Sequence, residues 1–401
     1  MKKILAIVMA LVLVFSLAAC GSKSGSETKE PEKAAVKVGF IFLHDENSTY
    51  DLNFINGAKA ACEATGVEYL FKTNIPEGNE CYEAAADLVD QGCNIIFADS
   101  FGHEDYLIKA AKEFTDVQFC HATGTKAHTE KLANYHNAFA SIYEGRYLAG
   151  VAAGMKLNEM IKAGKFTAKE AKMGYVGAYT YAEVVSGYTS FYLGAKSVCP
   201  SVTMEVQFTG SWYDESKEKE AATKLINNGC KLISQHADSM GAPNACETAG
   251  VPNVSYNGST VAACPNTFIV SSRIDWAPYM EYMIKCVQNG QAIDTDWCKG
   301  LSEGAVALTD VNTKAAAAGT QEAIDKAAAE LKAGTLHVFD TNNFTVEGKN
   351  LTTYLADVDT DANYEKDTEA IKDGYFHESE YRSAPYFDIQ IDGIKLLNTA
   401  F

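Results

Sequence analysis

The sequence predicts an α/β protein with two lobes, each built on a doubly wound parallel sheet, and a ligand cleft between them. Short apolar runs alternate with segments whose apolar residues recur at helical spacing. The alternation occurs in two series, over about 36–163 and about 172–256. Residues 88–102 and 225–241 also resemble each other, because both pass from a helix through Gly-Cys and an apolar strand to Asp-Ser and Gly.

The first series starts with the apolar run 36–43, which predicts a strand, and continues with a helix over about 52–65 that Gly66 ends. From Tyr82 to Val89, apolar residues at i, i+3, i+4 and i+7 predict another helix. The other expected elements are strand 67–71, strand 92–97, helix 103–113, strand 117–121 and helix 142–163. Strands and helices of these lengths form βαβ units.

The second series repeats this pattern. Its expected elements are strand 172–177, helix 182–196, strand 203–208, helix 214–228, strand 231–235 and strand 252–256. They are followed by strand 267–272, helix 276–289, a strand near 304–308, an Ala-rich helix over 315–333 and a hairpin or edge strand within 383–397.

We therefore expect two lobes with exchanged segments. Lobe 1 comprises 36–155 with a return segment of about 273–300. Lobe 2 comprises 156–272 with about 301–401, and the end of that range is a C-terminal extension that the pattern does not place.

The N-terminus predicts export and a lipid anchor. Lys2 and Lys3 precede an apolar run that ends at Leu17, too short to span a bilayer comfortably. Leu17-Ala18-Ala19-Cys20 resembles a bacterial lipobox, so 1–20 is expected to be a signal peptide and Cys20 to be acylated. A plain secretory signal is the alternative. Residues 21–35 contain no large apolar side chain and predict a flexible tether. The protein is thus expected on the outer face of the bacterial cytoplasmic membrane.

Composition excludes several classes of function. A net charge of −18 argues against nucleic acid as a partner, because phosphate contacts need a basic surface. Only three arginines are present, which disfavours a doubly anionic ligand. The ten cysteines after Cys20 show no C-x-x-C or metal-ligand spacing and are expected to be small buried hydrophobes, although a Cys246–Cys264 disulfide is possible. Known catalytic motifs are absent, so we expect no enzyme activity, no metal and no cofactor.

Aromatic and polar residues gather after the predicted strands, where parallel sheets bind ligands. The candidate ligand-binding residues are Asn47, Tyr50, Asp51, Asp99, Phe101, His121, Trp212, Asp214, His236, Asp238 and Asn257. Asp51 and Asp214 could instead cap helices, and the two histidines could hydrogen-bond within the cleft wall. Aromatic faces beside carboxylates and amides suit a flat, polar, largely neutral ligand, either a sugar or a nucleobase.

The order of these segments resembles the basic membrane protein family of solute-binding lipoproteins, the receptors of ABC importers. The matching segments are Ser100-Phe101-Gly102, His121-Ala122-Thr123-Gly124, Tyr143-Glu144-Gly145-Arg146-Tyr147-Leu148-Ala149-Gly150, Trp212-Tyr213-Asp214 with Lys217-Glu218, and Gln235-His236-Ala237-Asp238-Ser239. The resemblance implies a type I periplasmic-binding-protein fold with three crossovers, ABC permease subunits as partners, and a purine nucleobase or nucleoside as ligand. It assigns ligand contacts to Phe101, Trp212, Asp214, His236 and Asp238.

The sequence departs from the family pattern at two places. Tyr50-Asp51-Leu52-Asn53-Phe54 stands where nucleoside receptors have Asp-x-Ser-Phe-Asn, and Ser255-Tyr256-Asn257-Gly258 replaces a Gly-Val-Asp segment that holds ribose. Residues 340–401 have no counterpart. The alternatives are a receptor for a sugar or another small polar solute, a surface enzyme, and a lipoprotein for signalling or adhesion.

Overall fold

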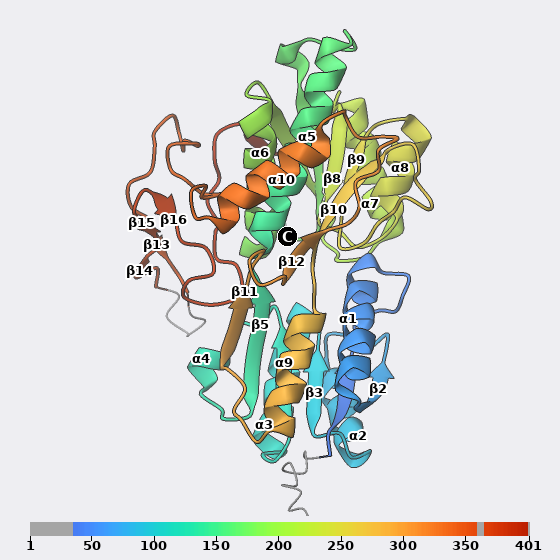
Figure 1. Ribbon diagram of the computed structural model, residues 1–401, viewed down its shortest axis with the longest axis vertical. Helices are drawn as coiled ribbons and strands as arrows, with labels where there is room; N and C mark the ends of the chain where they lie inside the picture. The colour runs from blue at the N-terminus through green and yellow to red at the C-terminus, as the bar shows by residue number, and fades with distance from the viewer. Residues whose placement is uncertain (1–34, 359–364, 400–401) are drawn as a thin grey trace, which may run out of the picture. The chain divides into compact units, whose positions relative to one another are not determined.

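The computed structural model describes residues 35–358 and 365–399, and its two large sheets are one parallel sheet and one almost entirely parallel sheet (Figure 1). The predicted signal peptide, Cys20 and nearly all of the predicted tether lie outside the described residues. Within the described ranges, no helix combines the length and apolar composition needed to cross a membrane.

The first sheet has the strand order β11-β5-β4-β3-β1-β2, and every pair of adjacent strands in it is parallel. Its strands are β1 (Lys37–Ile41), β2 (Glu68–Lys72), β3 (Ile95–Ala98), β4 (Gln118–Ala122), β5 (Tyr135–Ala140) and β11 (Asp296–Lys299). Strands β5 and β11 were not predicted from the sequence, because polar residues interrupt their apolar pattern. Strand β11 returns to this sheet from far along the chain.

The second sheet has the order β12-β10-β9-β8-β6-β7-β17. Its strands are β6 (Lys172–Gly177), β7 (Thr203–Phe208), β8 (Leu232–Gln235), β9 (Asn253–Tyr256), β10 (Phe268–Ile274), β12 (Val306–Leu308) and β17 (Ile394–Leu396). Only β12 runs antiparallel to its neighbour. The expected edge strand within 383–397 is β17, which pairs with β7.

Helices connect the strands of both sheets. Their bounds are α1 (Thr49–Thr65), α2 (Asn79–Asp90), α3 (Glu104–Glu113), α4 (Ala127–Glu130), α5 (Ile142–Lys162), α6 (Ala182–Val198), α7 (Glu215–Asn227), α8 (Gly241–Ala249), α9 (Ala277–Gln288) and α10 (Thr320–Lys332). Helix α8 was not expected, because it contains both Gly241 and Pro243. The expected Ala-rich helix from 315 starts only at Thr320, since Gly319 adopts a left-handed conformation with φ 79°.

Asp51 and Asp214 were both candidate helix caps in the sequence, but of these two only Asp214 caps a helix in the structure. Ser48, not Asp51, caps α1, and its side chain accepts the Asp51 N–H. Asp214 does cap α7, where its side chain accepts the Lys217 N–H. Gly66 ends α1 with φ 67°, as expected.

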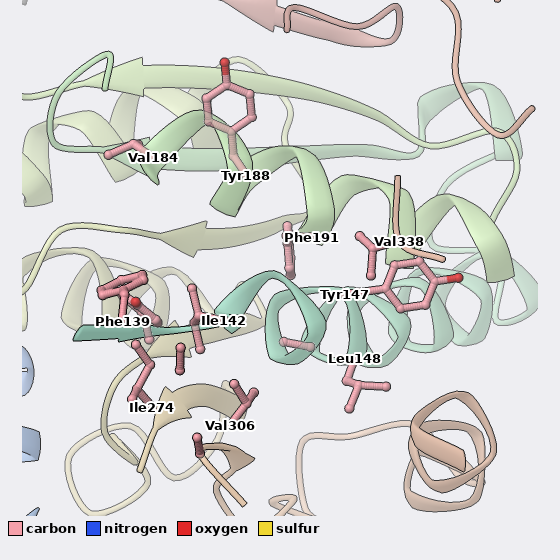
Figure 2. Packing of buried hydrophobic residues seen from close by; sticks show 14 of the residues in the cluster. Phe139, Ile142, Tyr147, Leu148, Val184, Tyr188, Phe191, Ile274, Val306 and Val338 are labelled. Carbon is pink, nitrogen blue, oxygen red and sulfur yellow. The ribbon is translucent and has the colours of Figure 1, made fainter. Parts of the chain in front are cut away.

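Helices α5 and α6 pack so closely that glycine is required at the contact. A Cβ on Gly150 would lie 2.0 Å from the Phe191 carbonyl oxygen, and one on Gly194 would lie 2.0 Å from that of Tyr147. Side chains such as Leu148, Tyr147 and Phe191 fill the surrounding core (Figure 2). This contact fixes the position of α5, which carries Arg146.

The C-terminal segment, defined here as residues 336–358 and 365–399, packs on both sheets. Phe339 stacks on Phe387 with ring centroids 4.2 Å apart. The Gln390 amide donates to the Tyr188 hydroxyl of α6, and the Ser383 N–H donates to Asp296 of β11 over 2.7 Å. The segment therefore has a hydrophobic centre of its own and polar contacts to α6 and to β11 of the first sheet.

Ten cysteines lie among the described residues, and all are unpaired thiols. Nine are buried, which agrees with the interpretation of these residues as small hydrophobes. Cys246 and Cys264 form no disulfide.

Candidate functional site

A cavity lies where the carboxyl ends of strands from both sheets meet. Its lining residues are Leu43, His44, Tyr50, Ser100, Phe101, Thr123, Glu183, Trp212, His236, Asp238 and Tyr256. The cavity contains about 370 Å³ of space not filled by atoms, part of it open to solvent, but the centre of a water molecule can occupy only about 20 Å³ of it. The walls therefore nearly touch in this structure, and we refer to the cavity as the inner pocket.

Contacts across the inner pocket hold its two walls together. The backbone N–H of Thr49 donates to the Asp238 carbonyl over 3.1 Å, and the Thr49 hydroxyl donates to the same oxygen. The rings of Phe101 and Tyr181 face each other with centroids 5.3 Å apart. Thr49 and Phe101 lie in segments that follow β1 and β3 of the first sheet, whereas Tyr181 and Asp238 follow β6 and β8 of the second. These pairs therefore join the two halves of the pocket wall, and the structure is a closed arrangement of the pocket.

The fully buried Arg146 lies behind the pocket wall. Its Nη1 donates to the Gln235 carbonyl over 3.1 Å, and its guanidinium carbon lies 3.2 Å from the centre of the Tyr256 ring. Its Nη2 is 2.9 Å from Nδ1 of His236. Because a guanidinium can only donate, Nδ1 accepts and Nε2 of His236 carries the proton, which faces Glu183 at 3.3 Å. Arg146 thus sets the tautomer of a pocket residue.

The same surroundings keep His236 neutral. Burial, followed by the positive charge of Arg146, lowers the pKa of His236. A neutral imidazole with Nε2–H oriented toward Glu183 is a fixed polar group in the pocket wall.

Asp238 supplies a buried carboxyl group to the inner pocket. Burial, together with the neighbouring acids Glu218 and Asp51, holds its pKa well above the ordinary value. Among the described residues, nothing hydrogen-bonds to this carboxyl group, whereas its own backbone N–H donates to the Trp212 carbonyl over 3.0 Å. The carboxyl group is therefore available to a ligand that offers N–H or O–H donors.

Aromatic faces come from both sides of the pocket. The Tyr50 hydroxyl donates to the Asp99 carbonyl over 2.8 Å, which fixes that ring. The Trp212 indole packs edge-on against Tyr179, with centroids 5.0 Å apart. Phe101 remains 38% exposed although it is a large apolar residue, so its ring is accessible at the mouth of the pocket.

Five of the eleven candidate residues from the sequence line the inner pocket: Tyr50, Phe101, Trp212, His236 and Asp238. The structure places three others away from it. Asn47 is exposed, and its amide donates to Asp45 over 2.8 Å. Asp214 caps α7, and Asn257 faces a separate groove beside α1.

Asp51, Asp99 and His121 are buried behind the loops that form the pocket. Asp51 accepts the His44 N–H over 2.8 Å, and Asp99 accepts the Leu43 N–H over 3.1 Å. His121 Nε2 lies 2.7 Å from the Ser100 carbonyl. These side chains hold the backbone of pocket residues and do not form the pocket wall.

Sequence reasoning missed the pocket residues Leu43, His44, Ser100, Thr123, Glu183 and Tyr256. Ser100, Thr123 and Tyr256 lie within segments that resemble or replace family motifs, so the sequence did carry a signal for them. Glu183 lies in the first turn of α6, where an acid is ordinary. Arg146 is one of only three arginines in the sequence and belongs to the matching segment 143–150, so its signal was also present.

Within residues 35–358 and 365–399, no three His, Cys, Asp or Glu side chains cluster in a way that could hold a metal ion.

Comparison with known proteins identifies the family. Residues 42–335 match the family model Bmp, described as ABC transporter substrate-binding protein PnrA-like. The chain belongs to this family. It is therefore a substrate-binding protein and not an enzyme, and the family resemblance seen in the sequence is confirmed.

The similar proteins differ in their described ligands. A purine-binding protein of Brucella abortus is 34% identical over 278 residues, which cover 68% of this chain and 75% of that protein. A putative ABC transporter glucose-binding protein of Haloferax volcanii is 32% identical, covering 49% of this chain and 46% of that protein. The structure of an ABC transporter solute-binding protein from Conexibacter woesei superposes with TM-score 0.61 at 20% identity, covering 76% and 98% of the two chains. The expected periplasmic-binding-protein-like fold is confirmed.

Proposed function

We propose that this chain is the extracytoplasmic receptor of an ABC importer and binds a purine nucleobase or nucleoside in the inner pocket. The observation that supports this best is the combination of the Trp212, Tyr50 and Phe101 rings with the buried Asp238 carboxyl group. A purine offers a flat π surface for the rings and N–H groups for the carboxyl group.

The charges around the pocket favour a ligand without phosphate. Asp238 and Glu183 both line it, and Arg146 is engaged with Gln235, His236 and the Tyr256 ring. A nucleotide would bring its negative charges close to Glu183 and to the buried Asp238 carboxyl group, where burial and neighbouring acids already disfavour negative charge and raise the pKa. The Brucella relative supports a purine, since it is described as purine-binding.

A sugar is the second candidate ligand. Aromatic rings beside carboxylates also suit sugar rings and hydroxyls, and the Haloferax relative is described as a putative glucose-binding protein.

Cys20 and the tether complete the proposed function. We infer that an acylated Cys20 holds the receptor on the outer face of the cytoplasmic membrane, and that residues 21–35 let it reach the permease. Closure of the pocket walls around a ligand would then present a loaded form to the permease.

Calorimetry and thermal melting with a small ligand panel test the proposal. Adenine, guanine and their nucleosides should bind and raise the melting temperature, because a ligand that binds only the native state stabilises it. The matching monophosphates should bind much more weakly. If no purine binds while glucose or ribose does, the purine assignment is wrong and the sugar candidate replaces it.

A further inference from the structure

We propose that the C-terminal segment forms an outer wall of the ligand cleft and selects purines that carry a neutral substituent, such as a nucleoside, over the free base. This inference rests on the proposed function. It adds a specificity role for residues that lie beyond the 42–335 range matched by the family model.

The first observation is a second cavity, here called the outer chamber, that adjoins the inner pocket. Its lining residues are Phe101, Thr123, Thr125, Tyr181, Ala182, Glu183, Asp357, Arg382, Ala384 and Pro385. Three of these, Phe101, Thr123 and Glu183, also line the inner pocket. The centre of a water molecule can occupy about 230 Å³ of the outer chamber, against about 20 Å³ of the inner pocket. The roomier space thus adjoins the side chains proposed to hold the ring.

The second observation is that the outer wall is firmly held. Ala384 and Pro385 are buried, and both lie between two backbone attachments. The Ser383 N–H donates to Asp296 over 2.7 Å, and the Phe387 N–H donates to the buried Glu378 over 2.9 Å. A wall fixed on both sides can discriminate between ligands by shape.

The composition of the outer chamber indicates what it accepts. Phe101, Tyr181, Ala384 and Pro385 provide apolar surface, while the threonine hydroxyls can hydrogen-bond. Glu183 and Asp357 contribute two negative charges against one positive charge from Arg382. An anionic substituent would meet this excess of acid, whereas a neutral, partly apolar group with hydroxyls matches it.

The test fills the outer chamber and compares two probes. Ala384→Trp places a large ring in the chamber, and Leu355→Trp adds the same ring at a residue that is 48% exposed and does not line either cavity. Adenine and adenosine are titrated calorimetrically into the full chain and both variants. Ala384→Trp should weaken adenosine binding at least about tenfold and adenine binding less than about threefold, and Leu355→Trp should change neither.

The melting temperature of each variant without ligand shows whether it folds. Ala384→Leu adds less volume and is used if the Trp variant is unfolded. It should also weaken adenosine binding more than adenine binding. If wild type binds purines and both probes weaken equally in Ala384→Trp, the outer wall does not select the substituent and only this inference is overturned. If wild type binds no purine, the proposed function fails and this inference fails with it.

Discussion

Glu218 offers a sharp test of the electrostatics beneath the inner pocket. It is fully buried on α7 and accepts the Ser239 N–H over 3.1 Å and the Asp214 N–H over 3.1 Å. It therefore ties the loop after β8, which contains Asp238, to the loop that carries Trp212. Burial raises its pKa from 4.5 to about 7.

The raised pKa gives the sign of the pH dependence. Between pH 4.5 and about 7 the folded chain binds this proton and the unfolded chain does not, so stability falls as pH rises. Each unit by which the pKa differs between the folded and unfolded chain changes the free energy of unfolding by about 1.4 kcal/mol. The free energy of unfolding should therefore fall by on the order of 3 kcal/mol between pH 4.5 and pH 8. Glu218→Gln stays neutral and keeps an acceptor oxygen. The variant should match wild type near pH 4.5 and exceed its free energy of unfolding by about 2–3 kcal/mol at pH 8.

Urea unfolding of the ligand-free chain at several pH values measures this difference. Glu220→Gln removes the same charge from an exposed position on α7 and should change the free energy of unfolding by less than about 0.5 kcal/mol throughout. A Glu218→Gln difference that does not vary with pH would refute the reasoning, because it would mean that the pKa of Glu218 is the same in the folded and unfolded chain.

Three further predictions concern the ring stack, the anchor and the core. Trp212→Ala should weaken purine binding by about 1–3 kcal/mol in calorimetry; a large fall in the melting temperature without ligand would show instead that the half-buried indole serves packing. Cys20→Ala should move the protein from the membrane to the soluble fraction, and full retention with unchanged mass would contradict acylation. Gly150→Ala should lower the free energy of unfolding, measured with denaturant, by about 1–3 kcal/mol, because its Cβ would lie 2.0 Å from the Phe191 carbonyl oxygen. An unchanged midpoint would mean that α5 and α6 can move apart with little loss of stability.

Strands with continuous apolar runs were predictable from sequence, and strands with polar interruptions were not. The apolar runs before Leu43 and after Cys93 identify β1 and β3 because both faces of a parallel sheet are buried. Strand β11 contains Asp296 and Lys299, and its place in the first sheet depends on pairing with β5, more than 150 residues earlier. Local periodicity carries no information about such a pairing.

Pocket residues could be predicted from the sequence where an aromatic or polar side chain directly follows a predicted strand. Trp212, His236 and Asp238 follow strands of the second sheet and line the pocket. Asp51 and Asp99 also follow or adjoin strand ends, yet each points its carboxyl group back to a backbone N–H. A one-dimensional pattern places a residue at an edge of a sheet but does not give the direction of its side chain. That direction decides between a ligand contact and support for a loop.

Strand β17 has a consequence for how the chain reaches its native state. It covers the edge of β7, and the two strands are separated by nearly 190 residues. Until residue 396 has been made, β7 presents an unpaired row of N–H and C=O groups, the kind of edge that invites association between chains. Shortening the chain before Ile394 would leave that edge permanently open. Such a truncated protein should form aggregates through its second sheet even if its pocket residues are all present.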